Sequence, residues 1–252
     1  MHASFDGSTP RKVVLVTGAA RRIGAAIARR LHADGHDLAL HYRASQADMD
    51  ALLAELNAGR AGSAIALQAD LAAFDRLPEL VANTVGHFGR LDALVNNASA
   101  FYPTPIGGAT PAQWDELFAS NARAPFFLAQ AAAPHLKAAR GGIVNIADLH
   151  GETPLANHAV YCMAKAALLM LTKSLATDLA PWVRVNAIAP GAILWPEQGK
   201  DPSAQAALIA RTPLQRIGAP EDIAGCAAWL LGEDAAYVTG QVVHVDGGRH
   251  MD

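Results

Sequence analysis

The stretch KVVLVTGAARRIG, residues 12–24, decides the fold. It opens with a short apolar run, Lys12–Val16, that is typical of a buried strand. A glycine-containing turn, Thr17–Gly24, follows, and Ile23–Ala33 then repeats apolar residues at helical spacing. Strand, glycine turn and helix in this order place backbone N–H groups where a dinucleotide pyrophosphate binds. An ordinary strand-to-helix turn is the alternative interpretation of this feature alone.

The same alternation of short β-branched runs and longer Ala- and Leu-rich stretches continues to the end of the chain. The predicted strands are residues 12–16, 37–42, 63–68, 91–95, 142–146, 183–188 and 241–245. The predicted helices are residues 23–33, 46–57, 71–88, 111–136, 157–179, 203–211 and 220–231. This rhythm requires a parallel sheet covered on both faces. We therefore predict a single-domain α/β fold, a Rossmann-type doubly wound parallel sheet of about seven strands with helices on both faces.

Composition excludes several classes of protein. The 252 residues are 52% hydrophobic and 17% charged, so the chain is not intrinsically disordered. The net charge is −3 and no Lys/Arg run occurs, which argues against a nucleic-acid partner. No stretch approaches the ~18 apolar residues of a membrane span, and neither Cys162 nor Cys226 lies in a metal-binding spacing. We expect a cytoplasmic protein with no membrane partner and no metal.

Domain organisation follows from the lack of any Ser/Gly linker or break in composition. We predict a flexible N-terminal segment, residues 1–11, and one domain, residues 12–252. Residues 192–213 are richer in polar residues and Pro than their surroundings, and long insertions in compact domains often form lids. We expect this segment to cover the substrate. Trp195 would close over the substrate or, alternatively, make a core or subunit contact.

The end of the second predicted strand discriminates between the two nicotinamide dinucleotides. An NAD site places a carboxylate there to bind the ribose hydroxyls. This chain has no acid at that point; the residues are His41, Tyr42, Arg43, Ala44 and Ser45. Arg43 and Ser45 can instead hold a 2′-phosphate through charge-assisted hydrogen bonds, which favours NADPH. A solvated arginine at the end of a strand is the alternative.

Tyr161 and Lys165 lie four residues apart in a predicted helix and therefore share one face. An ammonium group beside a phenol lowers the pKa of the phenol. We therefore expect Tyr161 to be a usable general acid near neutral pH. The spacing itself is generic, so an exposed lysine beside a half-buried tyrosine is the alternative.

Together these motifs resemble the short-chain dehydrogenase/reductase family over nearly the whole chain. Further matching motifs are Asp70-Leu71, Asn96-Asn97-Ala98, Asn121 and Pro190-Gly191. The resemblance implies hydride transfer from a nicotinamide to a carbonyl or imine carbon, in a homotetramer.

The resemblance also implies roles for individual residues. Asp70 and Leu71 would contact adenine, and Asn97 would lie on the adenosine ribose side. Lys165 would bind the nicotinamide ribose, and Asn121 would hold a water of a proton relay. The full predicted cofactor set is Gly18, Arg22, Ile23, Gly24, His41, Tyr42, Arg43, Ser45, Asp70, Leu71, Asn97, Ala98, Ser99, Lys165, Pro190 and Gly191.

One position departs from the family pattern. The family has a serine 13 residues before its catalytic tyrosine, and this chain has Asp148 there. A carboxylate would repel a developing alkoxide, so the site does not suit simple ketone reduction. It suits a substrate with N–H donors or ring nitrogens that need protons. The alternative is that Asp148 only caps a loop and that another serine serves.

Asp148, Arg22 in place of the middle glycine, and the segments 41–45 and 97–103 resemble the pteridine reductases. That resemblance implies a pterin between the nicotinamide and Phe101, since a flat heteroaromatic ring stacks well on Phe. Ser99 and Arg22 would contact the pterin and the cofactor phosphate. Residues 194–216 are more similar to bacterial relatives that reduce dihydropterins such as dihydromonapterin, with weak activity on dihydrofolate.

The sequence therefore predicts NADPH-dependent reduction of a pterin C=N bond, with Tyr161 donating the proton. The predicted catalytic residues are Asp148, Tyr161, Lys165 and Asn121, and the predicted substrate-binding residues are Arg22, Ser99, Phe101, Asp148, Tyr161 and Trp195. Two alternatives stay open. One is a short-chain carbonyl reductase acting on a 3-oxoacyl thioester or a sugar ketone; the other is a non-catalytic NADP(H)-sensing protein, which need not keep Tyr161, Lys165 and Asn121.

Overall fold

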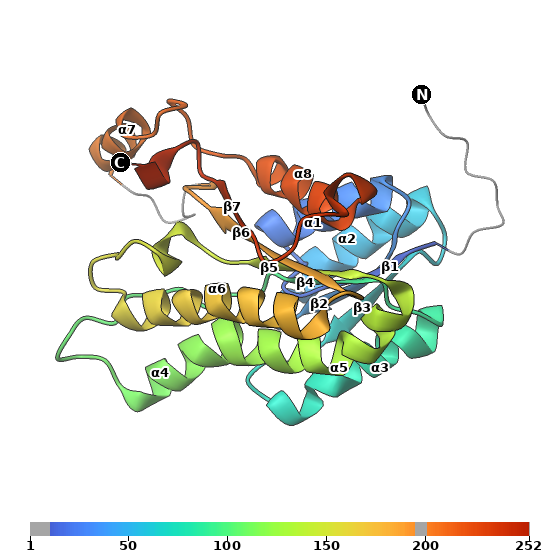
Figure 1. The fold of residues 1–252 in the computed structure, drawn as a ribbon. Helices are drawn as coiled ribbons and strands as arrows, with labels where there is room; N and C mark the ends of the chain where they lie inside the picture. Colours follow the sequence, from blue (N-terminus) through green and yellow to red (C-terminus); the bar gives the residue numbers. More distant parts are fainter. Residues whose placement is uncertain (1–10, 195–200, 252) are drawn as a thin grey trace.

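Seven parallel strands form one sheet in the computed structural model, which describes residues 11–194 and 201–251. The strands are β1 (Val13–Val16), β2 (Asp37–Tyr42), β3 (Ala64–Gln68), β4 (Ala93–Asn96), β5 (Gly142–Ile146), β6 (Arg184–Pro190) and β7 (Val242–Val245). Their spatial order is β3-β2-β1-β4-β5-β6-β7 (Figure 1). The chain runs outward from β1 to β3 and then returns to β4 on the other side of β1. This confirms the predicted Rossmann-type doubly wound fold and places a ligand crevice where β1 and β4 meet.

Helices cover both faces of the sheet (Figure 1). One face carries α1 (Arg22–Ala33), α2 (Gln46–Gly59) and α8 (Pro220–Leu231), and the other carries α3 (Leu77–Phe88), α5 (Ala124–Ala139) and α6 (Ala159–Leu179). Alternate residues of β1 pack against the two helix layers. Val14 and Val16 pack on the face with α1, α2 and α8, and Leu15 packs on the face with α3, α5 and α6. Burial on both faces explains why the strands read as continuous apolar runs.

The predicted helix over residues 111–136 is in fact two helices. α4 (Pro111–Phe118) and α5 are joined by a π-helical turn, Ala119–Arg123, in which the N–H of Ala124 donates to the carbonyl oxygen five residues back. Such a turn adds one residue to the helix, but it is formed by the same types of residue as an ordinary α-helix. Helical periodicity therefore cannot locate it.

Two other predicted helices begin later than expected. Within residues 71–88 a short 3₁₀ turn comes first, and α3 begins at Leu77, with Pro78 in its first turn where no backbone N–H is needed. α6 begins at Ala159, because Asn157 has a left-handed φ of 60°.

Helix α6 corrects one expectation from composition. By length and apolar character alone it would be able to cross a membrane, but half of its most apolar stretch is buried inside the protein. It packs against β6 and α5, and its Tyr161 and Lys165 are buried. These contacts are those of a core helix in a three-layered α/β protein.

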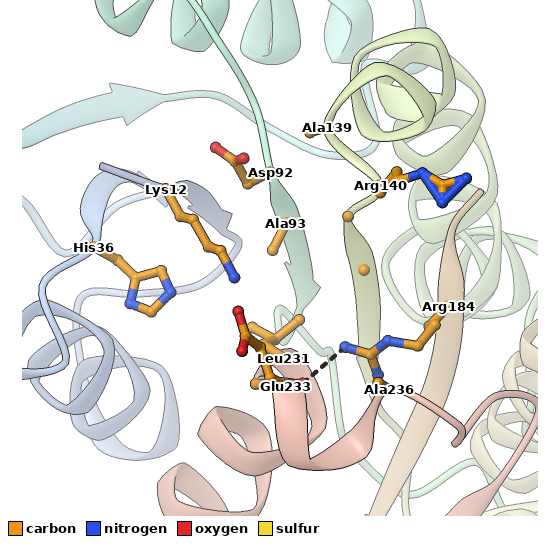
Figure 2. A pocket seen from close by; sticks show the side chains of 13 residues that line it. Lys12, His36, Asp92, Ala93, Ala139, Arg140, Arg184, Leu231, Glu233 and Ala236 are labelled. Carbon is orange, nitrogen blue, oxygen red and sulfur yellow. Dashed lines mark hydrogen bonds between the residues drawn. The ribbon is translucent and has the colours of Figure 1, made fainter. Parts of the chain in front are cut away.

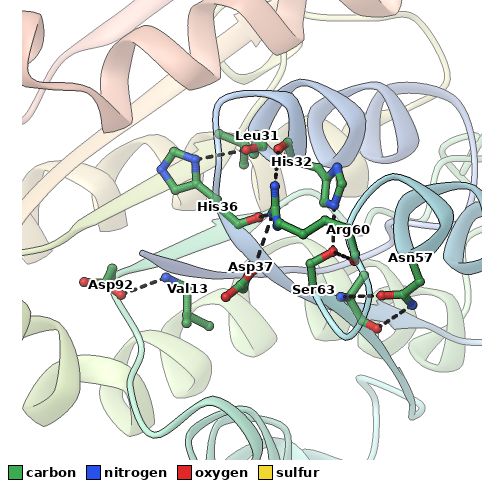
Figure 3. A network of polar contacts seen from close by, with 10 residues as sticks. Val13, Leu31, His32, His36, Asp37, Asn57, Arg60, Ser63 and Asp92 are labelled. Carbon is green, nitrogen blue, oxygen red and sulfur yellow. Dashed lines mark hydrogen bonds and ion pairs between the residues drawn. The ribbon is translucent and has the colours of Figure 1, made fainter. Parts of the chain in front are cut away.

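A polar network holds the amino edge of the sheet near β2 and β3 (Figure 3). Arg60, which follows α2, donates to the carbonyl oxygen of His32 at 3.1 Å and to that of His36. Its guanidinium lies 3.4 Å from Asp37, and Asn57 pairs with the backbone of the first residue of β3. Asp37 is therefore engaged at the amino end of β2, the opposite end from a dinucleotide ribose.

Parts of two predictions lie outside the described residues. These are the predicted flexible segment 1–11, apart from Arg11, and Trp195 with the rest of residues 195–200. The described part of the predicted lid contains α7 (Pro202–Ala210), close to the predicted helix over residues 203–211. On the other side of the undescribed stretch, Ile193 forms a bridge with Gly218.

Candidate functional site

A cavity of about 640 Å³ opens at the carboxyl edge of the sheet. It lies beyond the carboxyl ends of the neighbouring strands β1 and β4, and its walls come from the segments that follow β1, β2, β3 and β4. The predicted cofactor residues that line it are Gly18, Arg22, Ile23, Gly24, His41, Tyr42, Arg43, Ser45, Asp70, Leu71, Asn97, Ala98 and Ser99. Lys165, Pro190 and Gly191 are not among its lining residues.

The turn after β1 can accept a phosphate. Gly18 has a φ of 62°, and a Cβ on Gly24 would lie 2.2 Å from the carbonyl oxygen of Gly18, so both positions need glycine. Arg21, the N-cap of α1, makes no side-chain capping hydrogen bond, and the first turn of α1 borders the cavity. Backbone N–H groups at a helix N-terminus without a side-chain cap are suited to an anion.

Arg22 stands at the position of the usual middle glycine and has a backbone conformation that favours glycine. Its φ is 53°, in the left-handed region, which costs a non-glycine residue about 1–2 kcal/mol. Its guanidinium lines the cavity and lies 3.5 Å from the carbonyl oxygen of Ile193. A charged side chain held at the cavity in a strained conformation is a candidate ligand for phosphate.

His41 lines the cavity and also supports its walls. Its Nδ1 accepts a hydrogen bond from the N–H of Gly18 at 3.2 Å, and its Nε2 lies 3.1 Å from the carbonyl oxygen of Ala69. The two bonds together require the proton on Nε2, and burial lowers the pKa of the ring. Beyond it, Arg43 is exposed at the mouth of the cavity.

Asn97 and Thr17 tie the turn after β1 to the turn after β4. Asn97 Nδ2 donates to the carbonyl oxygens of Thr17 and Gly18 at 2.9 and 3.0 Å. The hydroxyl of Thr17 accepts from the N–H groups of Asn97 and Ala98 at 2.9 and 3.1 Å. Because these bonds bridge the crevice, they define the width of the site.

Tyr161 and Asp148, two of the predicted catalytic residues, form a close polar pair. The Tyr161 hydroxyl donates to Asp148 Oδ2 at 2.6 Å, and Asp148 Oδ1 accepts from the N–H of His150 at 2.8 Å. Burial raises the pKa of the Tyr161 phenol, and the Asp148 carboxylate raises it further. The prediction that the pKa of Tyr161 is lowered beside Lys165 is therefore wrong, because burial and the neighbouring carboxylate raise it.

Lys165 is almost fully buried, with 2% of its surface exposed. Its ammonium donates to the carbonyl oxygen of Ile146 at 3.0 Å and lies 5.7 Å from the centre of the Tyr161 ring. Burial lowers its pKa to about 8, although Asp148 acts in the opposite direction. The lysine is therefore held close to losing its proton.

The π-turn between α4 and α5 places Asn121 beside Ser99. Asn121 Nδ2 donates to the carbonyl oxygens of Ala100 and Leu117, both at 2.9 Å, and its Oδ1 accepts from the Ser99 hydroxyl at 2.7 Å. Ser99 lines the cavity, so its bond joins Asn121 to the cavity wall. The structure thus brings the predicted catalytic residues Asp148, Tyr161 and Lys165 together.

Phe101 stands at the exposed edge of this group. Its ring is 57% exposed and meets the Tyr161 ring edge to face, with centres 4.8 Å apart. His158 stacks on Phe101 with ring centres 4.8 Å apart and planes 13° from parallel. Proximity to Tyr161 in the chain places His158 near the pocket, but the stacking itself has no signal in the sequence.

Comparison with known proteins identifies the family. A sequence profile described as "Enoyl-(Acyl carrier protein) reductase" matches residues 18–250. The chain belongs to the short-chain dehydrogenase/reductase family. Pteridine reductase 1 of Leishmania tarentolae is 39% identical, and the match covers 95% of this chain and 96% of that protein.

Other relatives are nearly as similar. 3beta-Hydroxysteroid dehydrogenase 1 of Eggerthella lenta is 37% identical over 95% of this chain and 94% of its own length. A 3-oxoacyl-[acyl-carrier-protein] reductase of Staphylococcus aureus is 35% identical over 95% and 98%. This family member is therefore an oxidoreductase, and the family uses nicotinamide cofactors. The similarities alone do not select a substrate.

In this short-chain dehydrogenase/reductase, the sequence does not single out several residues that line the cavity. Arg21 lines it and lies 3.7 Å from Asp48. Glu116 lines it and accepts from the Tyr102 hydroxyl at 2.9 Å. Ser120 lines it and accepts from the N–H of Ala100. Charged and polar residues of these types are common on helix surfaces, so nothing in their spacing marks them.

A second cavity, of about 210 Å³, lies at the amino edge of the sheet, opposite the site (Figure 2). Its charged lining residues include Lys12, Asp92, Arg184 and Glu233. Arg184 donates to the carbonyl oxygens that end α8, and Asp92 accepts from the backbone of β1. These two side chains therefore hold elements of the family fold together, and the predicted site residues are absent from this cavity.

Proposed function

We propose that this short-chain dehydrogenase/reductase is an NADPH-dependent pterin reductase. The observation that carries the proposal is the hydrogen bond between Tyr161 and Asp148, 2.6 Å long, at the position where the family has serine. A carboxylate accepts N–H groups of a heteroaromatic ring and repels the alkoxide that forms when a ketone is reduced. The similarity to Pteridine reductase 1 of Leishmania tarentolae supports the same substrate class.

The residues that line the large cavity fit NADPH. The first turn of α1, with Gly18, Gly24 and Arg22, would hold the pyrophosphate. Arg43 and Ser45 follow β2, where no acid stands, and would hold a 2′-phosphate. When bound, this cofactor supplies the hydride that adds to the substrate.

Replacing Arg22 with glycine is expected to have opposite effects on stability and on binding. The free energy of unfolding should rise by up to about 1 kcal/mol, because glycine tolerates a φ of 53° without strain. The Kd for NADPH should rise by about tenfold, because one charged hydrogen-bond donor to phosphate is lost. Urea unfolding and NADPH fluorescence titration measure the two effects.

Arg21→Gly is the matched control, because Arg21 carries the same charge at an extended φ of −141°. It should bring no gain in stability. If Arg22→Gly loses stability as Arg21→Gly does, the strain at this turn is not real.

The side chains of this protein would then place the substrate and move its proton. The Phe101 ring is 57% exposed and would stack on a flat substrate, which limits the orientations open to that substrate. Tyr161 would donate its hydroxyl proton to a ring nitrogen, and Asp148 would accept a substrate N–H. Lys165, buried beside the Tyr161 ring, supplies a positive charge at the reacting centre while it keeps its proton.

The proposal is tested by NADPH consumption at 340 nm with purified protein. Dihydrobiopterin, dihydromonapterin and dihydrofolate are compared with a 3-oxoacyl thioester, a steroid ketone and a sugar ketone. We expect kcat/KM for the best dihydropterin to exceed that for the best ketone by at least about 100-fold, or about 2.7 kcal/mol of transition-state discrimination. Ketone turnover without dihydropterin turnover would establish the carbonyl reductase alternative, for which the steroid and oxoacyl relatives speak. NADPH binding with no turnover would favour the sensor alternative.

We further propose that the protein is a soluble, cytoplasmic homotetramer. Large apolar side chains stand exposed on the helices that cover one face of the sheet. Phe126 of α5 is 43% exposed, and Met163 and Met170 of α6 are 43% and 62% exposed. Exposed apolar residues on packed helices are suited to contact with a second copy.

A further inference from the structure

Two side chains of the π-turn between α4 and α5 reach two different walls of the large cavity. Asn121 Nδ2 donates to the carbonyl oxygen of Ala100, in the segment after β4, at 2.9 Å. Arg123, on the same turn, donates from its guanidinium to the carbonyl oxygen of Ala72, in the segment after β3, at 3.2 Å. Ala72 and Ala100 both line the cavity. The π-turn therefore joins the start of α5 to both segments.

Arg123 holds the segment after β3 by a second contact. Its guanidinium carbon lies 5.3 Å from the centre of the Phe74 ring, a cation–π arrangement. The Phe74 ring also lies against that of Phe127 in α5, with ring centres 5.8 Å apart. Among the described residues, Arg123 Nε is buried and has no hydrogen-bond partner. Such an unpaired N–H group destabilises the folded protein, so the stability of the fold alone does not account for this arginine.

The segment that Arg123 contacts has only local hydrogen bonds of its own. The backbone N–H groups of Ala72, Ala73 and Phe74 all donate within the segment, and these three residues are exposed. In the described part of the chain, the bond from Arg123 is the one hydrogen bond that joins residues 70–75 to a distant element. An exposed segment with local bonds alone samples many conformations, and ordering it costs conformational entropy. Arg123 therefore orders this segment before any ligand arrives.

We propose that Arg123 is a positioning residue that holds the segment after β3 in the shape that receives the adenosine half of the cofactor. Asp70, Leu71 and Ala72 of this segment line the cavity. Because β2 and β3 are neighbouring strands, the segment stands beside the one after β2, which would hold the 2′-phosphate. Arg123 is absent from the cavity lining and acts through Ala72 and the Phe74 ring. The inference rests on the proposed function only in that a nicotinamide dinucleotide fills the cavity.

The first test measures how the two halves of NADPH bind separately, by NMR titration. In Arg123→Ala the Kd of adenosine 2′,5′-bisphosphate should rise by about tenfold, because binding must then order the segment itself. The Kd of reduced nicotinamide mononucleotide should stay unchanged. Arg123→Lys keeps a charged donor and should lie between Arg123→Ala and the wild type. An equal rise in Kd for both halves would show a general loosening of the fold and would overturn the proposal, as would an unchanged Kd for the adenosine half.

Arg140→Ala is the matched control for this test. Arg140 also stands over an aromatic ring, that of Trp182, but it follows the far end of α5, away from the large cavity. Its replacement should leave both Kd values unchanged. A rise for the adenosine half as large as that in Arg123→Ala would show that the effect does not depend on the segment after β3.

Phe74→Leu tests the connection from the other side, since it keeps Arg123 and removes the ring beneath its guanidinium. It should raise the Kd of adenosine 2′,5′-bisphosphate by about threefold. The double variant with Arg123→Ala should bind no worse than Arg123→Ala alone, because both changes break the same connection. Fully additive effects would show that Arg123 does not act through this segment.

The second test separates positioning from chemistry. With the best substrate of the panel, Arg123→Ala should raise KM for NADPH by about tenfold and leave kcat within about twofold, because the bound cofactor orders the segment itself. A fall in kcat with KM unchanged would overturn the proposal in favour of an effect on Asn121, on the same turn.

The binding test needs no substrate, so it distinguishes this proposal from the proposed function. The expected shift in Kd without any dihydropterin turnover would keep the role of Arg123 and reject the pterin reductase. If the protein binds NADH in place of NADPH, adenosine 5′-monophosphate replaces the bisphosphate, and the same shift is expected. Dihydropterin turnover with no shift in Kd or KM would reject the role of Arg123 alone.

Discussion

Replacing Asp148 with serine is expected to lower kcat/KM for the best dihydropterin by at least about 100-fold and to bring measurable ketone reduction. The substitution removes the carboxylate that accepts a hydrogen bond from the Tyr161 hydroxyl at 2.6 Å. The same carboxylate would accept a hydrogen bond from a substrate N–H. The substitution also removes one of the two main causes of the raised pKa of Tyr161, so the phenol becomes a better acid. An alkoxide can then form beside Tyr161 without facing a negative charge.

The fold should survive this change. Asp148 caps the short 3₁₀ turn that follows β5 by accepting from the N–H of His150, and serine is an equally good cap. Asp148→Asn is the matched variant, because it keeps the size of the side chain and removes the charge. The same NADPH assay and substrate panel apply. If Asp148→Ser reduces dihydropterins as fast as the wild type, Asp148 takes no part in the reaction and the main support for the proposed function is lost.

Replacing Lys165 with methionine is expected to lower kcat by at least about 100-fold and yet to stabilise the folded protein near pH 7.5. The pKa of Lys165 is about 8 in the folded protein, against an ordinary value of 10.5. Below pH 8 the folded state therefore bears the full cost of a buried ammonium, about 3 kcal/mol. Methionine removes this cost and one hydrogen bond to Ile146, for a net gain of about 2 kcal/mol.

This gain should depend on pH with a definite sign. Between pH 8 and 10.5 the unfolded wild type binds a proton that the folded protein has released, so Lys165 makes the free energy of unfolding rise with pH. Burial raises the pKa of Cys226 to about 11, and that thiol acts in the opposite direction above pH 9. The difference between Lys165→Met and the wild type cancels the contribution of Cys226. We expect this difference to shrink from pH 7.5 to pH 10.

Urea unfolding of the cofactor-free protein at several pH values measures the effect. Lys173→Met, at an exposed position on the same helix, is the control and should match the wild type at every pH. A Lys165→Met protein that is less stable than the wild type by the same amount from pH 7.5 to pH 10 would show that burial does not lower the pKa of this lysine.

The fold could be predicted from the sequence because the patterns that indicate its strands and helices are local and repeated. The run Val13–Val16 with the following turn identifies β1 and α1, and each later strand repeats the same apolar pattern. The predicted helix boundaries were wrong where a single backbone angle determines the boundary. The left-handed φ of Asn157 delays the start of α6 to Ala159, two residues after the predicted start, and the residue type alone does not show it.

The site could be predicted from the sequence where the residue type alone implies the chemistry. It could not be predicted where the chemistry depends on the distances between residues. Asp148 stands where the family has serine, 13 residues before Tyr161, and this difference shows directly in the sequence. The sign of the pKa shift at Tyr161 does not, because it depends on burial and on a 2.6 Å contact with Asp148 rather than on the four-residue spacing to Lys165. The bond from Ser99 to Asn121 likewise joins residues whose proximity only the fold reveals.

The π-turn at Ala119–Arg123 separates two helices that differ in phase. One added residue rotates everything after it by about 100° about the helix axis. The buried side of α5, with Leu128, Ala132 and Leu136, is therefore offset from the stripe that a continuous helix starting at Pro111 would present. The number of residues in the π-turn therefore determines the orientation of α5 as much as its composition does. In a homologous chain that lacked one residue here, the buried side of α5 and the amide of Asn121 could not both keep their present orientations.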